Sequence, residues 1–256
     1  MRHLASVITM LAGVSAASAQ DAAAPAAPPP APQPDSFWDG WAGSFQLGLN
    51  GASGNSENFN FRAGAATERK TDLMVTKFGA VYTRATREGD VTSNRFEING
   101  RNDWIFEKGS PWRAFAQAVY EYDDFQDWDH RLSAGVGIGY AFIENDTTLL
   151  VGRVGIGAFR EFGGRDNRIH PEGILGIDFT HKFDDRQKIF FTADYYPDLI
   201  EWPDYRVVAK AGYEYLVDPK NKLTLKLGVE DRYDASPGPG RSRNDFEYFA
   251  LLSWAF

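Results

Sequence analysis

The last thirteen residues of the chain, 244–256, alternate between two kinds of side chain. One set is apolar or aromatic throughout, whereas the other becomes charged toward its start at Glu247 and Asp245. Because successive side chains of a strand face opposite sides, this pattern predicts a strand with one wholly apolar face. That face carries rings at both ends and the chain stops at Phe256, which is typical of the final strand of an outer-membrane β-barrel.

The same alternation recurs from Trp41 onward, interrupted by residues that favour turns. In the fourth segment, for example, Ile98 and Trp104 lie on the face opposite to Glu97. The pattern predicts about twelve strands, at residues 41–52, 58–69, 74–87, 92–106, 112–123, 131–142, 147–162, 172–183, 188–196, 205–216, 222–233 and 244–256. Most of these lengths suit tilted strands that cross a membrane.

The connections between these segments alternate in length and character. Short turns rich in Gly, Asp, Asn and Pro are expected at 107–110, 144–146, 184–186 and 218–221. Mostly longer and irregular loops are expected at 53–57, 88–91, 124–130, 163–171, 197–204 and 234–243. Short turns at one end and longer loops at the other are the layout of bacterial barrels, and an even strand count places both chain ends at the short-turn, periplasmic end.

Charges of both signs occupy the polar faces of the predicted strands. In a closed membrane barrel the apolar faces contact lipid and the polar faces line the lumen. We therefore predict an all-β fold, a closed antiparallel up-and-down transmembrane β-barrel over residues 37–256. Its lumen is expected to be lined by Arg95, Glu97, Arg101, Asp103, Arg113, Glu121, Arg153, Asp178, Asp194, Arg206, Lys210, Glu214, Lys226 and Glu230. The alternative is a soluble sandwich with charge on a solvated face.

The N-terminal region has a different composition. Residues 1–19 have a positive start, a short apolar stretch and the small residues Ala17-Ser18-Ala19, which predict a cleaved signal peptide rather than a buried helix. Residues 20–36 are rich in Ala and Pro and predict an extended periplasmic tether. No later run of 18 or more apolar residues predicts a membrane-spanning helix.

Overall composition narrows the classes of function. The formal charge of −8 argues against a nucleic-acid partner. The absence of cysteine removes disulfides, thiol catalysis and thiolate metal sites. We expect no cofactor. The expected partners are outer-membrane lipid, lipopolysaccharide and the barrel-assembly machinery, which would engage the C-terminal strand ending at Phe256.

Three segments together resemble a known family. They are GNSENFNFRAG at 54–64, RNDW at 101–104 and YEYDDFQDWDHRLSAGVGIGYAFI at 120–143. The chain resembles a domain-of-unknown-function family of salt-induced outer-membrane β-barrel proteins, and the likeness runs over about residues 41–256. The resemblance implies an outer-membrane barrel with a link to salt or osmotic stress. It implies no activity, substrate or site, and it does not include the tether.

Several residues invite a chemical interpretation. Asp124, Asp127 and Asp129 would suit weak calcium binding, although the loop lacks the glycine and closing glutamate of an EF-hand, and a solvated surface loop is the alternative. His130 and Ser133 could both face the lumen, which suggests a lipid hydrolase only if the serine lay at the lipid surface. Neither His170 nor His181 has metal-ligand spacing with His130. We therefore predict that the protein is not an enzyme.

Glycines recur within two predicted strands, at Gly135, Gly137, Gly139, Gly152, Gly155 and Gly157. They lead into no helix, so they do not form a phosphate-binding loop. We expect them to make room for large neighbours such as Arg153 and Phe159, or to let the wall curve.

The mixed charge of the predicted lumen allows two functions. It could line a narrow or gated polar channel for small solutes or ions, or it could pair across the lumen and close it, leaving a structural barrel whose loops bind ligands. Pairing of Arg95, Arg101, Arg113 and Arg206 with Glu97, Asp103, Glu121 and Glu214 across the lumen would favour the closed alternative. No segment of the sequence is evident as an inward plug.

Overall fold

Twelve antiparallel strands make up the folded part of the chain, for which the computed structural model describes residues 39–52, 58–164 and 166–256. The strands are β1 (Trp41–Ala52), β2 (Asn58–Lys70), β3 (Met74–Arg87), β4 (Asp90–Ile105), β5 (Trp112–Asp123), β6 (His130–Glu144), β7 (Thr148–Phe162), β8 (Ile169–Lys182), β9 (Gln187–Pro197), β10 (Tyr205–Asp218), β11 (Leu223–Asp234) and β12 (Asn244–Ala255). Within these ranges, no helix is long and apolar enough to cross a membrane. The predicted signal peptide at 1–19 and tether at 20–36 lie outside the described residues.

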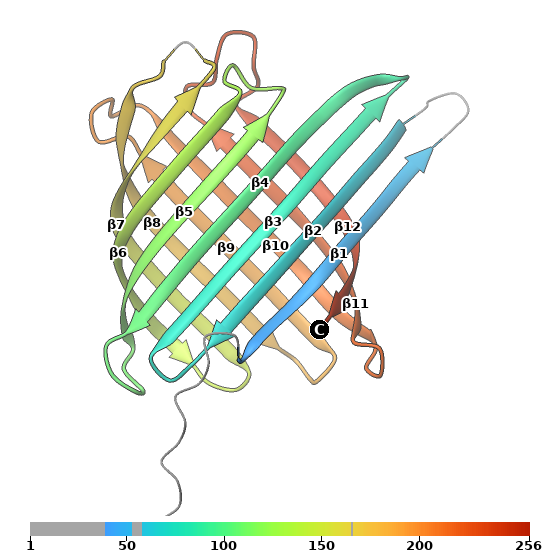
Figure 1. Ribbon diagram of the computed structural model, residues 1–256, viewed down its shortest axis with the longest axis vertical. Helices are drawn as coiled ribbons and strands as arrows, with labels where there is room; N and C mark the ends of the chain where they lie inside the picture. Colours follow the sequence, from blue (N-terminus) through green and yellow to red (C-terminus); the bar gives the residue numbers. More distant parts are fainter. Residues whose placement is uncertain (1–38, 53–57, 165) are drawn as a thin grey trace, which may run out of the picture. The chain divides into compact units, whose positions relative to one another are not determined.

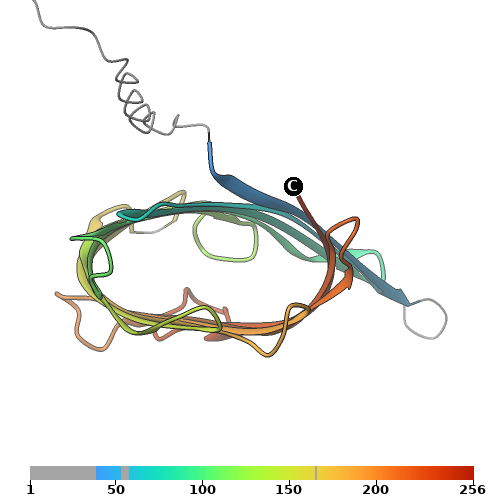
Figure 2. The same ribbon diagram turned by 90° about the horizontal axis from the view of Figure 1, so that it is seen from below.

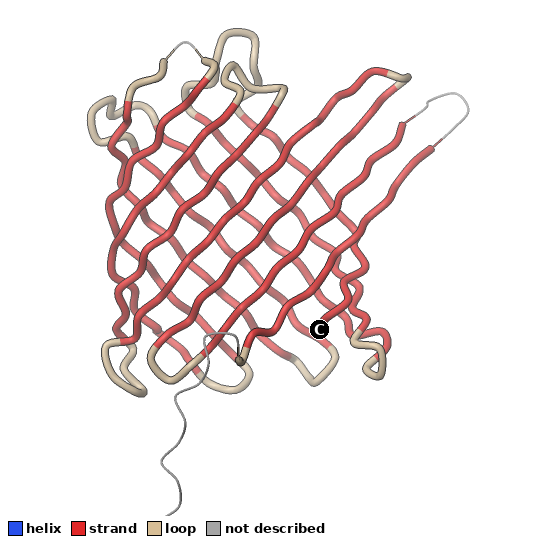
Figure 3. Tube along the Cα trace, viewed as in Figure 1, coloured by secondary structure: helices blue, strands red, loops and turns tan. Residues whose placement is uncertain are grey.

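The strands close into a barrel (Figures 1 and 3). Each strand pairs with the next along the chain, and β1 completes the ring by pairing with β12. Figure 2 shows that the ring is oval in cross section. The predicted fold class and strand number are confirmed, and the start of β1 lies beside the end of β12, at the short-turn end.

The outer surface of the barrel is apolar and its interior is charged. On β7, Ile156 is 65% exposed, and on β12 Tyr248 is 76% exposed, whereas Glu230 inside the barrel is only 1% exposed. Soluble barrels and sandwiches bury their apolar faces, so this inversion excludes the soluble alternative. A closed ring with an apolar exterior is the arrangement that hydrocarbon requires, since it leaves no open sheet edge.

Most predicted strand boundaries agree with the structure within a few residues, but the connection between β3 and β4 differs. Glu88 and Gly89 have φ values of 54° and 86°, and two consecutive residues with positive φ are typical of a type I′ hairpin turn. The sequence pattern predicted a loop over 88–91. The tight turn lets β4 begin at Asp90 instead.

Glycines of β6 and β7 pair with one another across the two strands. Gly137 pairs with Gly155 across the two strands, and Phe115 on β5 and Ile174 on β8 pair with these glycines from either side. Phe115 is 2% exposed and Ile174 is 1% exposed. The glycines therefore make room for large neighbours, as predicted, but these are Phe115 and Ile174.

Replacing Gly137 with alanine is expected to lower the free energy of unfolding by about 1–3 kcal/mol, the usual cost of overpacking. A Cβ atom there would meet the Val154 carbonyl oxygen and the Phe115 ring. Urea unfolding in lipid vesicles measures the effect. The control is Gly64→Ala on β2, where the nearest atom to a new Cβ is the Ala80 carbonyl oxygen at 3.1 Å. Equal losses in the two variants would contradict the steric explanation.

Candidate functional site

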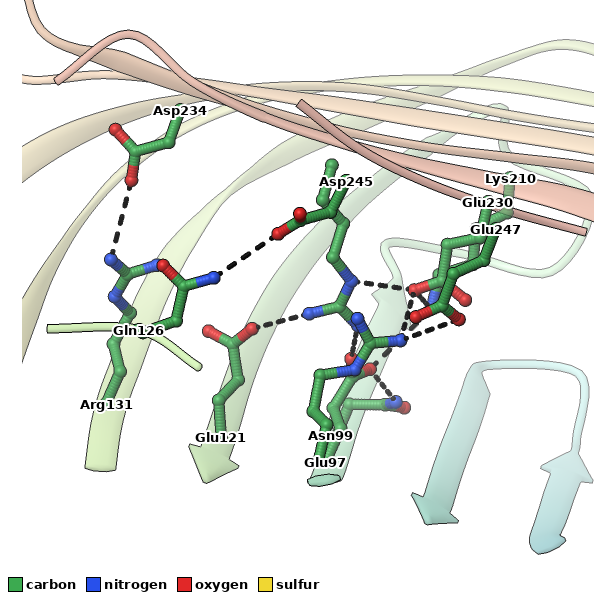
Figure 4. A network of polar contacts seen from close by, with 12 residues as sticks. Glu97, Asn99, Glu121, Gln126, Arg131, Lys210, Glu230, Asp234, Asp245 and Glu247 are labelled. Carbon is green, nitrogen blue, oxygen red and sulfur yellow. Dashed lines mark hydrogen bonds and ion pairs between the residues drawn. The ribbon is translucent and has the colours of Figure 1, made fainter. Parts of the chain in front are cut away.

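A network of ion pairs crosses the barrel interior and is centred on Arg232 of β11. Arg232 donates through Nη1 to Glu121 at 2.8 Å and through Nε to Glu230 at 2.8 Å, and its Nη2 also binds Glu97. Glu121 on β5 lies opposite β11 in the ring of strands, so this contact spans the lumen. Figure 4 shows Glu97 and Glu121 on one wall and Glu230 and Glu247 on the other.

Three further cations complete this central network, which we define as Arg62, Arg95, Lys210 and Arg232 with Glu97, Glu121, Glu230 and Glu247. Arg62 lies 2.7 Å from Glu230 and 2.9 Å from Glu247, and Arg95 lies 3.2 Å from Glu247. Lys210 lies within 3.7 Å of both Glu97 and Glu230. The network holds equal numbers of the two signs, which is what burial of ions demands.

A second network joins β4 to the side of the barrel formed by β7, β8 and β9. Arg101 contacts Asp103 at 3.1 Å and Asp178 at 2.6 Å, and Arg153 contacts Asp178 at 3.2 Å and Asp194 at 2.9 Å. The Arg101–Asp178 pair joins β4 to β8 across the interior. Two guanidinium groups thus hold three carboxylates, with Asp178 shared between them, so the charges in this part of the lumen are also paired.

Every charged residue that the sequence placed in the lumen makes an ion pair inside the barrel, but the partners were not predictable. The sequence suggested four arginines and four acidic residues whose pairing would favour a closed lumen. Among the described residues, only Arg101 and Asp103 of that set pair with each other, and both lie on β4. Arg113 pairs with Glu144, Arg206 with Glu172, and Glu214 with Lys188 and Lys226. These pairs join strands that are neighbours or next neighbours in the ring, whereas the pairs of Arg232 with Glu121 and of Arg101 with Asp178 cross the lumen. Whether these residues line a conducting pore stays a prediction.

Sequence reasoning left several interior residues out of the predicted set. Arg62, Arg232 and Glu247 lie on polar strand faces and were recognisable by alternation, and so was Glu172, which is 2% exposed. Glu144 was assigned to a turn because its strand was predicted to end at 142, whereas β6 runs to Glu144. Alternation identifies which residues point inward, but it does not show which of them take part in the ion-pair networks.

Trp128 is a buried ring at the end of the lumen that carries the longer loops. It lies in the connection between β5 and β6, is 5% exposed, and covers the Arg131 guanidinium at 4.3 Å. Phe159 contacts the guanidinium groups of both Arg131 and Arg206, at 5.5 and 4.6 Å. Cation–π contacts of this kind hold arginine side chains against rings. A loop of polar composition thus supplies a buried ring that only the tertiary structure reveals.

A cavity of about 200 Å³, which we call the outer vestibule, lies beside Trp128, Arg131 and Phe159 and has a mainly acidic wall. Its charged residues are Arg131, Arg206, Asp127, Glu161, Asp166, Asp198, Glu201, Asp204 and Asp234, with His170. His170 lies 3.2 Å from Asp198 and 3.3 Å from Asp166. Partial burial raises the pKa of Asp198, but hydrogen bonds from Glu201, Ile200 and His170 outweigh it and hold that pKa below its usual range.

The three aspartates of the candidate calcium loop do not converge. Asp124 accepts hydrogen bonds from Tyr122 and Asn94, whereas Asp127 lies beside Gly238 and Asp129 beside Gly163. Across the described residues, no group of three or more His, Cys, Asp or Glu side chains could hold a metal ion. The geometry therefore gives no support to calcium binding at this loop.

His130 and Ser133 do not share a face, which corrects the expectation that both point into the lumen. The Tyr120 hydroxyl lies 2.9 Å from His130 Nδ1, and the His130 ring packs between Tyr120 and Tyr122. Ser133 is 9% exposed and lines the central cavity. They lie three positions apart along one strand, so alternation sends them to opposite sides. The structure does not assemble this pair into a hydrolase site.

Three cavities lie next to one another inside the barrel and share lining residues. The central cavity, of about 210 Å³, shares Arg206 and Tyr196 with the outer vestibule. It shares Lys210 with a third cavity of about 230 Å³ near β1 and β12. One or two side chains therefore line both members of each adjacent pair of cavities, and Arg206 and Lys210 among them are long cations.

The family model described as "Protein of unknown function, DUF481" matches residues 45–256. The chain belongs to this family. The match covers the barrel almost completely and bears out the resemblance to a family of unknown function, while the link to salt stays a prediction. No curated protein matches the chain.

Among solved structures, similar folds include channels and a translocator. The KdgM porin is 12% identical, with 84% of this chain and 99% of that chain covered and a TM-score of 0.46. For the NanC porin these values are 12%, 83%, 98% and 0.49, and for the translocator domain of the autotransporter NalP from Neisseria meningitidis they are 12%, 84%, 86% and 0.45. At this level of similarity no function transfers to this member of the family.

Proposed function

We propose that the protein is a narrow, ion-paired channel of the Gram-negative outer membrane that passes small ions and polar solutes. The observation that carries this proposal is the series of charge-lined cavities that share lining side chains. Arg206 and Lys210 occupy the boundaries between them. Rotation of these side chains would join neighbouring cavities without any movement of the strands, and charged side chains of this kind also select solutes.

Location in the outer membrane follows from the apolar exterior together with the predicted export signal and the aromatic C-terminal strand. In that membrane the exterior contacts lipid and the loop end faces lipopolysaccharide, and the strand ending at Phe256 would engage the barrel-assembly machinery. The predicted tether would lie in the periplasm.

Salt would act directly on such a channel. Mobile ions that enter the lumen compete with the fixed partners of the central network and screen the charges that remain exposed. We therefore propose that conductance rises more steeply than bulk conductivity as salt increases, which would give a physical basis for the osmotic link.

A closed-lumen structural barrel is the second candidate, because ion pairs reach across the lumen from Arg232 to Glu121 and from Arg101 to Asp178. Complete pairing fixes side chains and disfavours their rotation. In that case the outer vestibule would be a binding site for surface ligands rather than a channel entrance. A lipid-modifying enzyme, the third class considered, has no support from the placement of His130 and Ser133.

Recordings in planar bilayers separate the two candidates. The wild-type protein is expected to show small conductance steps over a range of salt concentrations. Lys210→Ala should enlarge the steps and shift the reversal potential toward cation selectivity, because it opens the boundary of the central cavity and removes a positive charge. Lys220→Ala, in an exposed turn, is the matched control and should resemble the wild type. Silence from both the wild type and Lys210→Ala would favour the closed barrel.

A further inference from the structure

The seam between β1 and β12 is closed over only part of its length. Backbone pairing joins Ser44–Leu47 to Ala255–Leu252 and then stops. The same register would continue from Gly48 with Leu251 to Ala52 with Glu247, yet β1 pairs only with β2 over those residues. Figure 2 shows the far part of β1 running outward past the wall formed by β11 and β12. A Cβ on Gly48 would still meet the Ala250 carbonyl oxygen and the Leu251 side chain, so the two strands separate only beyond Gly48. Backbone groups left without partners in hydrocarbon are costly, so the loss of pairing here needs a reason.

Side chains hold the barrel together behind this opening. Arg62 on β2 lies 2.9 Å from Glu247 on β12 and 2.7 Å from Glu230 on β11, and its guanidinium lies 5.0 Å from the centre of the Phe249 ring. These contacts cross from one side of the seam to the other without involving β1. Ion pairs between side chains can exchange partners when a charged ligand arrives, whereas a continuous ladder of backbone hydrogen bonds cannot.

The cavity of about 230 Å³ lies on the inner side of the seam, where Gln46 of β1 and Leu251 of β12 both contribute to its wall. Part of its wall is apolar, formed by Val81, Phe190, Phe249 and Leu251. The charged part carries Arg62, Lys210, Lys226 and Glu214. Arg62 and Lys210 also pair with carboxylates of the central network, so an anionic head would have to compete with those carboxylates. The combination matches a molecule with an apolar tail and an anionic head.

We infer that the upper seam between β1 and β12 is a lateral opening through which an anionic amphiphile passes between the bilayer and this inner cavity. The head contacts Lys210 and Lys226, and the tail lies along Phe249 and Leu251. Leu49 and Ala250 line the opening on the lipid side, and both are exposed there. The route does not require ion conduction along the barrel axis, so the inference stands apart from the proposed channel.

The cavity is tested by native mass spectrometry of the full protein in a nonionic detergent, titrated with dodecanoate. A one-to-one adduct is expected, and dodecyltrimethylammonium, which has the same tail and the opposite charge, should bind far more weakly. Lys210→Gln/Lys226→Gln should weaken dodecanoate binding about tenfold or more, because hydrogen bonds to a charged group are lost. Lys108→Gln, which removes an exposed cation bonded to Asp72 in a turn, is the control and should bind normally. Equal binding of both probes would overturn the site.

The lateral route is tested with disulfides, since the chain has no cysteine of its own. Leu49→Cys/Ala250→Cys would join the open part of the seam when oxidised, and Leu47→Cys/Leu252→Cys would join residues that already pair. Vesicles containing hexadecanoate deliver the amphiphile from the bilayer. Oxidation should abolish loading only in the first variant, and reduction should restore it.

Equal loading of the oxidised and reduced Leu49→Cys/Ala250→Cys protein would overturn the lateral route while leaving the cavity in place. A disulfide between two copies of the single variant Leu49→Cys within the membrane would also overturn it, because the open edge would then be covered by a second chain. Conductance measured on the same samples reports separately on the proposed channel.

Discussion

Replacing Arg232 with alanine is expected to lower the free energy of unfolding by about 3–5 kcal/mol, the typical effect of breaking a buried ion pair by removing one partner. Arg232 contacts three glutamates, and Glu121 has no other ion pair among the described residues. The loss would leave that carboxylate charged and unpaired inside the barrel. Urea unfolding of the protein in lipid vesicles measures the change.

Two further variants identify the cause of the loss. Arg232→Ala/Glu121→Gln should recover part of the stability, because the orphaned charge is removed together with its partner. Arg186→Ala, in an exposed turn, should change stability little. A loss below about 0.5 kcal/mol for Arg232→Ala, the range of ordinary surface substitutions, would contradict the paired network. If the lumen conducts, this variant should also favour cations more strongly than the wild type.

Ile156→Arg is expected to destabilise the protein by about 2–4 kcal/mol, because it places a charge on the lipid-facing surface near the middle of the bilayer. Ile156 lies near the middle of β7 and is 65% exposed. In a soluble barrel the same substitution at an exposed site would be almost neutral. The size of the destabilisation therefore shows whether lipid or water surrounds the outer face of the barrel.

Ile169→Arg is the matched control for this substitution. Ile169 is the same residue type, is 67% exposed and begins β8 at the loop end, where the cost of arginine should fall to about 0–1 kcal/mol. Both variants are compared by urea unfolding in vesicles. Equal and small effects would mean that the apolar exterior is not embedded in lipid.

Alternation predicted the strands and their faces well because it depends on a local property of the backbone. Successive side chains point to opposite sides, so the charged series on β4 and the apolar series on β12 show their faces directly. The same rule gave the interior positions of Arg95, Asp178 and Glu230. It failed for the β3–β4 connection, where the turn depends on two residues with positive φ rather than on polarity.

The partners of the interior charges were beyond that reasoning. Arg95 meets Glu230 and Glu247, which are far away in the sequence, because the tilt and register of the closed ring bring their strands to one height. The inward position of Trp128 likewise depends on how several loops pack together. Neither feature can be predicted from the alternation of side chains along a strand.

By itself, then, the sequence determined the number of strands, which face of each strand is apolar and which face carries charge, because those properties repeat along the chain. The tertiary structure alone decided which charges meet across the lumen, which side chains separate its cavities, and where β1 leaves β12. These features depend on contacts between distant strands, and the geometry of closure sets those contacts.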